Sequence, residues 1–226
     1  MAEKALIVGA GSGLSACLAR LFHKEGMEVA VAARRVDNIQ PLADEIGGKA
    51  YRCDVVDPSD VAALFESVDS DMGTPNIVVF NPSKRARGPV AELDPEEVRD
   101  AIMVTCYGAF LVAQQAAKRM LEQGHGSILL TGASAGVKGY PQSAPFAMGK
   151  FGLRGLAQSM ARELHPKNVH IGHFVIDGGI APSGQSGDND NRLNPEAIAE
   201  TYLQFHRQHR SAWAWEIELR PWVETF

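Results

Sequence analysis

The 226-residue sequence has few cysteines, no excess of basic residues and no long apolar run. Cys17, Cys53 and Cys106 are far apart and form no Cys-x-x-Cys pair, so we expect small buried thiols rather than disulfides or a metal site. The formal net charge of −5 gives general nucleic-acid binding no electrostatic support. No apolar run approaches the roughly 18 residues that cross a membrane, and we expect no secretory signal. These absences predict a soluble, cytoplasmic protein.

Short apolar segments alternate with amphipathic helical patterns along the whole chain. The expected strands cover residues 5–9, 28–33, 50–54, 76–80, 127–132, 170–176 and 216–219. The expected helices cover residues 13–25, 37–46, 58–69, 94–122, 144–164 and 194–208, and three begin at capping residues followed by proline: Asp57, Asp94 and Asn194. Nearly all-apolar strands favour a parallel sheet covered on both faces. The sequence therefore predicts an α/β fold: one Rossmann-like domain over residues 1–226, with a doubly wound parallel sheet of about seven strands.

The segment "IVGAGSGLSACLARLF" combines a strand, a glycine-rich turn and a helix. Gly9, Gly11 and Gly13 let the backbone approach a pyrophosphate, whose charge the start of the helix favours. Ser12 and Leu14 belong to the same turn. Because the motif lies in the first strand–helix turn, it predicts a dinucleotide site.

The second predicted strand ends in Ala-Ala-Arg34-Arg35 rather than in an acidic residue. An acidic residue there would bind the free ribose hydroxyls of NAD, whereas planar guanidinium groups match a 2′-phosphate. The pair therefore favours NADP over NAD; the alternative is two solvated arginines at a helix start. Asp54 follows the third predicted strand, where it is either an acceptor for the adenine amino group or a simple turn residue.

With these motifs the chain resembles the short-chain dehydrogenase/reductase family over nearly its whole length. Asp54 matches the family's adenine-binding aspartate, and Asn81 is kept from its Asn-Asn-Ala-Gly run. The segment "IDGGI" keeps Gly178 and Ile180 of the family's nicotinamide-binding segment, with Asp177 in place of the usual proline. The resemblance implies that Asn81, Gly178 and Ile180 join the cofactor site.

The family's proton donor is the tyrosine of a Tyr-x-x-x-Lys motif, and this sequence reads Phe146-Ala-Met-Gly-Lys150. The resemblance implies that Lys150 binds the nicotinamide ribose. Ala133 stands where the family has a serine, thirteen residues before the tyrosine position, and Thr105 stands where it has an asparagine. With three of four catalytic positions changed, we expect ordinary carbonyl reduction by the family mechanism to be severely weakened.

Other groups are candidates for the missing chemistry. Ser134 restores the hydroxyl if the strand register slips by one residue. Tyr140 is either a replacement acid or, as we favour, an aromatic residue that lines the substrate site. Asp177 is a candidate carboxyl acid, and Lys150 is a candidate to polarise a substrate oxygen directly. We expect His170 and His173 to be structural, because nothing gives them the spacing of metal ligands.

Two loops leave alternatives open. Lys84, Arg85 and Arg87 contact an anionic substrate or the cofactor's phosphates, or form a solvated basic loop. Residues 181–192, "APSGQSGDNDNR", form either a lid or a mobile surface loop.

These patterns favour an NADP-dependent oxidoreductase that acts on a small molecule with a degenerate catalytic set. The alternative is an NADP-binding scaffold or sensor with little turnover. The resemblance also implies a homodimer or homotetramer, built through the last strand and the fourth and fifth helices. The tryptophans near the end of the chain, Trp213, Trp215 and Trp222, are expected to pack around that strand.

Overall fold

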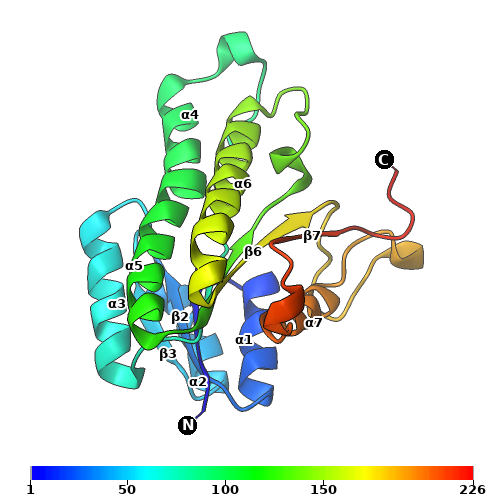
Figure 1. Ribbon diagram of the computed structural model, residues 1–226. Coiled ribbons are helices and arrows are strands. Elements are labelled where there is room, and N and C mark those ends of the chain that lie inside the picture. Colours follow the sequence, from blue (N-terminus) through cyan, green and yellow to red (C-terminus); the bar gives the residue numbers. More distant parts are fainter. Residues whose placement is uncertain (1, 226) are drawn as a thin grey trace.

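The computed structural model describes residues 2–225 and places a parallel sheet between two layers of helices (Figure 1). Seven strands pair in the order β3-β2-β1-β4-β5-β6-β7, and every pair is parallel. Their bounds are β1 (Lys4–Val8), β2 (Glu28–Ala33), β3 (Lys49–Arg52), β4 (Ile77–Phe80), β5 (Gly126–Thr131), β6 (Val169–Ile176) and β7 (Glu216–Leu219). This arrangement confirms the predicted doubly wound α/β fold. The strand order reverses beside β1, where such sheets bind ligands at the carboxyl ends of their strands.

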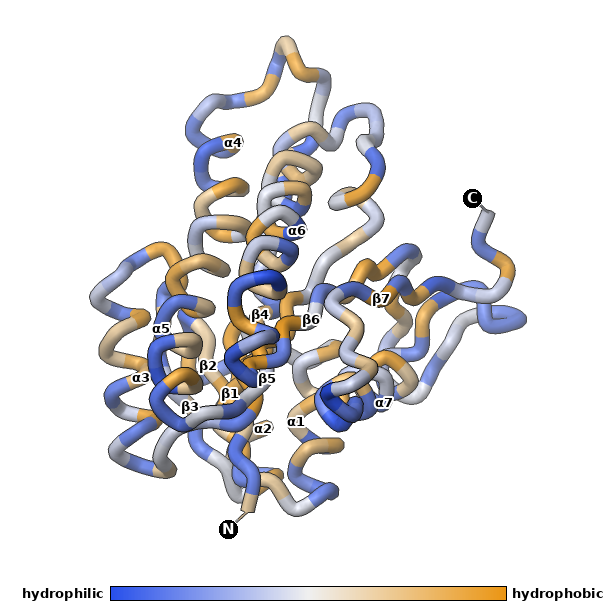
Figure 2. Tube along the Cα trace, in the orientation of Figure 1, coloured by the Kyte–Doolittle hydropathy of each residue, from blue (hydrophilic) through white to orange (hydrophobic). Residues whose placement is uncertain are grey.

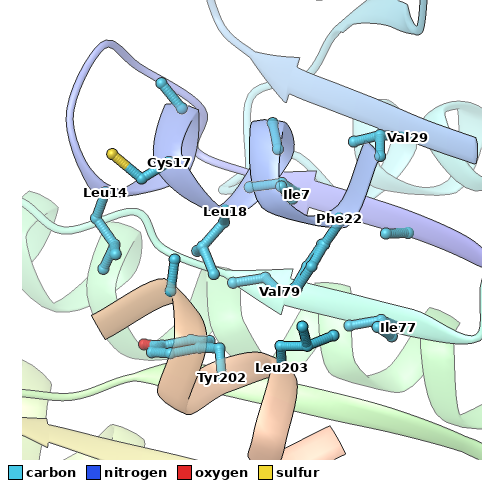
Figure 3. Close-up of a cluster of buried hydrophobic side chains, with 14 of the residues drawn as sticks. Ile7, Leu14, Cys17, Leu18, Phe22, Val29, Ile77, Val79, Tyr202 and Leu203 are labelled. Carbon is cyan, nitrogen blue, oxygen red and sulfur yellow. The ribbon is translucent and has the colours of Figure 1, made fainter. Parts of the chain in front are cut away.

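Successive residues of the inner strands face opposite helix layers. Ile7 and Val79 pack with α1 (Leu14–Lys24), α2 (Gln40–Glu45) and α7 (Pro195–His206). Figure 3 shows part of this cluster, with side chains of α1 and α7 meeting over the sheet. Leu6 and Val78 pack with α3 (Pro58–Met72), α5 (Gly108–Gln123) and α6 (Ala144–Leu164) on the other face. The strands are therefore apolar on both sides, as the hydropathy colouring in Figure 2 shows.

The expected helix over residues 94–122 is interrupted by one wider turn. It comprises α4 (Pro95–Ile102), a π-helical turn over Met103–Tyr107, and α5. The next helix, α6, packs closely against this turn through glycine: a Cβ atom at Gly149 would lie 2.9 Å from Cβ of Thr105. In Figure 1, α4 and α6 run side by side beyond the sheet. This arrangement carries Phe146 and Lys150 to the carboxyl ends of the strands.

The helix starts agree with the capping residues predicted from the sequence. The side chains of Asp57 and Asp94 each accept two backbone N–H groups, and that of Asn194 accepts the N–H of Ala197. The second helix is shorter than expected, because Pro41 lies in the first turn of α2 and residues Val36–Asn38 form a separate 3-10 turn. Within residues 2–225, every helix is too short or too polar to span a bilayer.

Two of the three tryptophans near the end of the chain pack as expected. Trp213 stacks on His170 with ring centroids 4.3 Å apart, and Trp215 packs partly buried against the core. Trp222 does not follow this expectation, because its side chain is 79% exposed. Its indole N–H instead donates to the carbonyl of Asn189 in the loop that follows β6.

Candidate active site

A cleft of about 630 Å³ opens at the carboxyl ends of β1, β2 and β4, where the strand order reverses. It is lined by Gly9, Ala10, Gly11, Ser12, Ala33, Arg34, Arg35, Asn38, Cys53, Asp54, Val55, Asn81, Pro82, Ser83 and Val104. Seven of the residues that the sequence placed at the cofactor therefore meet in one cleft: Gly9, Gly11, Ser12, Arg34, Arg35, Asp54 and Asn81.

The glycine-rich turn has the backbone geometry that a bound phosphate requires. Gly9 has a positive φ of 79°, and a Cβ atom there would lie 2.5 Å from the ring of Pro82. A Cβ atom on Gly11 would meet nothing within 4 Å, so open space lies beside the backbone. After Gly13, α1 begins at Leu14 with no acidic residue in its first turn. The side chain of Leu14 is buried in the core and does not line the cleft.

Asn81 and Ser15 brace this turn from inside the protein. The Asn81 side-chain amide donates to Ser15 Oγ at 2.7 Å, and that hydroxyl donates to the carbonyl of Gly9 at 3.3 Å. Ser15 is only 2% exposed and lies outside the cleft lining. Its hydroxyl therefore ties the glycine turn to the end of β4 and does not face the cleft.

Arg34, Arg35 and Asp54 form the far wall of the cleft. Both arginine side chains are exposed, and no ion pair or side-chain hydrogen bond joins either one to another residue of the described chain. Asp54 Oδ1 accepts the backbone N–H of Val56 at 3.3 Å, so the carboxylate closes a turn while it also borders the cleft. This wall offers two cations and one acceptor to a bound molecule.

A second cavity, of about 500 Å³, lies beyond the carboxyl ends of β5 and β6. It is lined by Arg85, Arg87, Ala133, Ser134, Ala135, Tyr140, Pro141, Gln142, Ser143, Phe146, Ile176, Asp177, Gly178, Gly179 and Glu224. The structure thus brings Phe146, Ala133 and Ser134 together, as their sequence spacing requires. Gly178 lines this second cavity rather than the first, and Ile180 lines neither: it bridges to Leu193 beside the core.

Lys150 lies beneath the second cavity and is 3% exposed. Its ammonium group donates to the carbonyl of Thr131 at 2.6 Å and lies 5.8 Å from the centroid of the Phe146 ring. Burial, together with the nearby charge of Arg85, lowers the pKa of Lys150 from 10.5 to about 7. Near neutral pH this side chain is therefore poised between its charged and neutral forms.

Phe146 forms an apolar floor for the second cavity and is 6% exposed. The guanidinium carbon of Arg85 lies 4.0 Å from the centroid of its ring, which is cation–π geometry. Loss of water contact, together with the charge of Arg87, lowers the pKa of Arg85. The Phe146 ring thus contacts the Arg85 guanidinium group, whereas a tyrosine at this position would also carry a phenol that donates a proton.

The other two changed positions differ in their surroundings. Ala133 and Ser134 both line the cavity, at the start of the 3-10 turn Ser134–Gly136. Thr105 is fully buried in the π-helical turn, and its hydroxyl accepts the backbone N–H of Lys84 at 3.2 Å. Thr105 lines neither cavity, so its hydroxyl supports the basic loop instead of facing a ligand.

The two candidate replacement acids both reach the second cavity. Tyr140 is 42% exposed, and its ring lies 5.7 Å from the Lys138 ammonium group. Asp177 is 4% exposed, and its Oδ2 lies 3.6 Å from Lys138 and 3.1 Å from Arg220. Because two cations engage the Asp177 carboxylate, its first role is in an ion-pair network at the cavity wall.

The histidines of β6 make structural contacts. Burial lowers the pKa of both His170 and His173 to about 4. His170 stacks between Phe205 and Trp213, and Nδ1 of His173 lies 2.9 Å from the Glu216 carboxylate. Across residues 2–225, no group of three or more His, Cys, Asp or Glu side chains could hold a metal ion.

The loop over residues 181–192 is fastened at several points. Ser183 and the backbone N–H of Gly184 both donate to Glu196 in α7, the latter at 3.0 Å. Arg192 donates to the carbonyl of Ile180 at 3.0 Å. These contacts hold the loop against the start of α7 and the segment that follows β6.

Several lining residues carry no sequence signal of their own. Asn38, Val55 and Val104 reach the first cleft from a 3-10 turn, a loop and the π-helical turn, none of which has an unusual composition. Glu224 reaches the second cavity from the end of the chain, about 78 residues after Phe146. Only the fold brings these residues to the two cavities.

A family model, a curated protein and two solved structures are similar to this chain. A family model described as short chain dehydrogenase matches residues 3–190. D-threitol dehydrogenase of Mycolicibacterium smegmatis is 28% identical over 172 residues, which cover 74% of this chain and 66% of that protein. The crystal structure of a short-chain dehydrogenase from Rhodopseudomonas palustris has a TM-score of 0.84 at 32% identity, covering 97% of this chain and 99% of that one. A metagenomic short-chain oxidoreductase in complex with NADP has a TM-score of 0.84 at 25% identity, covering 98% of each chain.

Proposed function

Because this chain belongs to the short-chain dehydrogenase family of oxidoreductases, we propose that it binds NADP and transfers hydride to or from a small molecule without a tyrosine acid. The observation that carries this proposal is the cleft at the reversal of strand order. There a glycine turn with open space beside it faces two arginines that lack acidic partners. The NADP complex of the metagenomic relative supports the same choice of cofactor.

The residues of the first cleft fit a phosphorylated dinucleotide. Gly9, Gly11 and Ser12 offer backbone to a pyrophosphate at the start of α1, whose dipole favours negative charge. Arg34 and Arg35 offer guanidinium groups to a 2′-phosphate. Gly13 and Leu14 belong to the same turn at the start of α1, although neither is among the residues that line the cleft. NAD would leave both arginines without an anion and is the less favoured cofactor.

Asp54 and Asn81 complete the nucleotide end of the cleft. We assign Asp54 to the adenine, whose amino group its carboxylate would accept. Asn81 has a supporting role, since its amide is bonded to Ser15 and holds the glycine turn. Gly178 and Ile180 are assigned to the nicotinamide end by the family resemblance, and of these two Gly178 borders the second cavity.

Lys150 links the nucleotide to the second cavity. One of its three N–H groups is used by Thr131, which leaves two for the nicotinamide ribose. When bound, the nicotinamide supplies or accepts the hydride. Phe146 can move no proton, and Thr105 is engaged by the basic loop. We therefore assign Ser134 as the hydroxyl that contacts the substrate oxygen, with Lys150 as the cation beneath it.

A second candidate function is an NADP-binding scaffold or sensor with little turnover. The observation that favours it is the joint loss of a phenol at Phe146 and a hydroxyl at Ala133 on the wall of one cavity. A positioned general acid contributes about 10²–10⁴ in rate, so its absence is costly for an alcohol–ketone reaction. The intact nucleotide cleft is common to both candidates.

The assembly and location are also proposed from the resemblance. We place the protein in the cytoplasm as one domain over residues 1–226 that forms a homodimer or homotetramer. The three cysteines are free, in keeping with a reducing compartment. Tyr107, which stacks on Phe110 at the surface, belongs to this assembly proposal and not to the catalytic set.

Calorimetric titration of NADPH and NADH into the wild type tests this function first. We expect NADPH to bind more tightly, and Lys150→Ala to weaken that binding. Arg34→Gln should reduce the preference for NADPH by about 10- to 100-fold, as expected for a charge-assisted contact. Arg52→Gln is the matched control, because Arg52 is also exposed but is already paired with Asp60 at 2.6 Å. If neither NADPH nor NADH binds, both candidate functions are ruled out.

A further inference from the structure

Arg85 and Arg87 bring two positive charges to the second cavity without acidic partners. Neither side chain has an ion pair or hydrogen bond to another residue of the described chain. Lys84, in the same loop, provides the contrast: its ammonium group lies 2.8 Å from Asp100 and it lines neither cavity. Lys84 is therefore paired within the protein, whereas Arg85 and Arg87 face the cavity.

The basic loop is anchored on both sides of these arginines. Ala86, between them, is 4% exposed, and the N–H of Gly88 donates to the carbonyl of Gln142 at 3.2 Å. Arg85 is held further by the Phe146 ring, 4.0 Å below its guanidinium carbon. A guanidinium group held in this way loses less freedom when it binds a ligand.

The remaining charges of the cavity limit the anion that fits. Asp177 pairs with Lys138 and Arg220, and Arg220 also pairs with Glu218, so these two cations and two carboxylates balance one another and do not neutralise the two arginines. Glu224 is the other acidic residue of the lining, and it leaves about one net positive charge when set against Arg85 and Arg87. A singly charged ligand balances this lining better than a doubly charged phosphate does. The apolar ring of Phe146 favours a ligand whose anionic group adjoins a hydrocarbon portion.

We propose that the second cavity binds the carboxylate of a small organic acid through the guanidinium fork of Arg85. Arg87 adds a second positive charge, and Phe146 is both the platform for Arg85 and the apolar floor for the rest of the ligand. A carboxylate matches the paired N–H groups of arginine, which makes this contact stronger than one with a neutral oxygen. The proposal deepens the proposed function, on which it rests, by making the substrate a small monocarboxylic acid.

The test is titration of pyruvate, propionate and benzoate into the full chain, followed by ligand-observed NMR, with and without NADP. We expect at least one of them to bind, and Arg85→Gln to weaken it about 10- to 100-fold. Arg85→Lys keeps the positive charge but lacks the paired N–H groups of the guanidinium, so its affinity for the acid should lie between those of the wild type and Arg85→Gln. Lys84→Gln removes the same charge from the same loop and should have no effect.

Three outcomes would overturn the proposal: no binding of any acid, equal losses in Arg85→Gln and Lys84→Gln, or tighter binding of inorganic phosphate than of the acids. Arg85 does not line the nucleotide cleft, so Arg85→Gln should still bind NADPH. NADPH binding by this variant also shows that it is folded. If NADPH fails to bind the wild type, acid binding without nucleotide still reports on the cavity, which keeps the two failures distinct.

Discussion

At the scale of single residues, Phe146 determines which proton chemistry the second cavity supports. Its ring supplies no proton, yet it contacts the Arg85 guanidinium group and lies 5.8 Å from the Lys150 ammonium group. A tyrosine keeps the ring and adds only a hydroxyl. Phe146→Tyr therefore tests the missing acid while leaving the platform for Arg85 in place.

We expect Phe146→Tyr to raise carbonyl reduction at least tenfold above the wild-type level. A general acid in position contributes about 10²–10⁴ in rate, and Lys150 lies close enough to lower the pKa of a new phenol. The measurement is NADPH oxidation with a panel of ketones and keto acids. Phe146→Leu, which adds no proton donor, is the control. If Phe146→Tyr with Ala133→Ser still gives no gain, the cavity serves a different chemistry.

Lys150 should make the stability of the protein depend on pH in a predictable direction. Its pKa falls from 10.5 to about 7 on folding, so between these values the unfolded chain holds a proton that the folded chain lacks. The free energy of unfolding then rises with pH across this window. Below the window it no longer depends on the titration of Lys150, because the side chain is charged in both states and the full cost of burying the charge is present. Denaturation of wild type and Lys150→Met from pH 6 to 10 isolates this effect. The free energy of unfolding of the wild type should rise relative to that of Lys150→Met as the pH rises. If the two free energies change with pH in parallel, the lowered pKa of Lys150 is contradicted.

At the scale of elements, apolar periodicity and caps located the seven strands and the α-helices to within a few residues, except that α4 and α5 were predicted as one helix. The π-helical turn at Met103–Tyr107 was beyond that reasoning, because one extra residue in a long amphipathic helix leaves the apolar pattern nearly unchanged. Its signal lies elsewhere in the sequence, in Gly149 of α6, where the wider turn comes too close for a side chain.

Two glycines of α6 should respond oppositely to alanine. A Cβ atom at Gly149 would lie 2.9 Å from Cβ of Thr105, so overpacking should destabilise Gly149→Ala by about 1–3 kcal/mol. A Cβ atom at Gly155 would meet nothing within 4 Å, and Gly155→Ala should stabilise the helix by up to about 1 kcal/mol. Urea denaturation of both variants measures the difference. Equal effects would mean that α6 and the π-helical turn are not in close contact.

At the scale of the whole molecule, most of the residues predicted for the cofactor gather in one cleft, whereas the lining of the second cavity was harder to predict. The glycine turn, Arg34 and Asp54 directly follow strands, and parallel strands bring their carboxyl ends to one edge. The second cavity draws on three loops and the end of the chain, including Glu224, whose positions follow from tertiary packing. For the same reason the sequence could not predict that Arg85 lines the cavity whereas Lys84, in the same loop, forms an ion pair with Asp100.

The outer surface of the molecule leaves apolar side chains exposed on two neighbouring helical segments. Tyr107 ends the π-helical turn, Phe110 lies at the start of α5, and Met148 and Phe151 lie on α6. Their exposed fractions are between 36% and 53%. The π-helical turn that precedes α5 packs directly on α6, so these side chains come from adjoining elements. Such a face is costly to leave in water, and a two-fold axis would cover it with its own copy.

Sedimentation velocity of the wild type at micromolar concentration should therefore show a dimer or tetramer. Phe151→Glu should shift the population towards the monomer, because a carboxylate buried at the contact has no partner there. Val90→Glu is the matched control, since Val90 is 80% exposed in a 3-10 turn before α4 rather than on α5 or α6, and it should leave the assembly intact. A monomeric wild type would instead assign this face to a different partner. A tetramer that Phe151→Glu reduces only to a dimer would require a second contact, and the edge strand β7 is then the element to test.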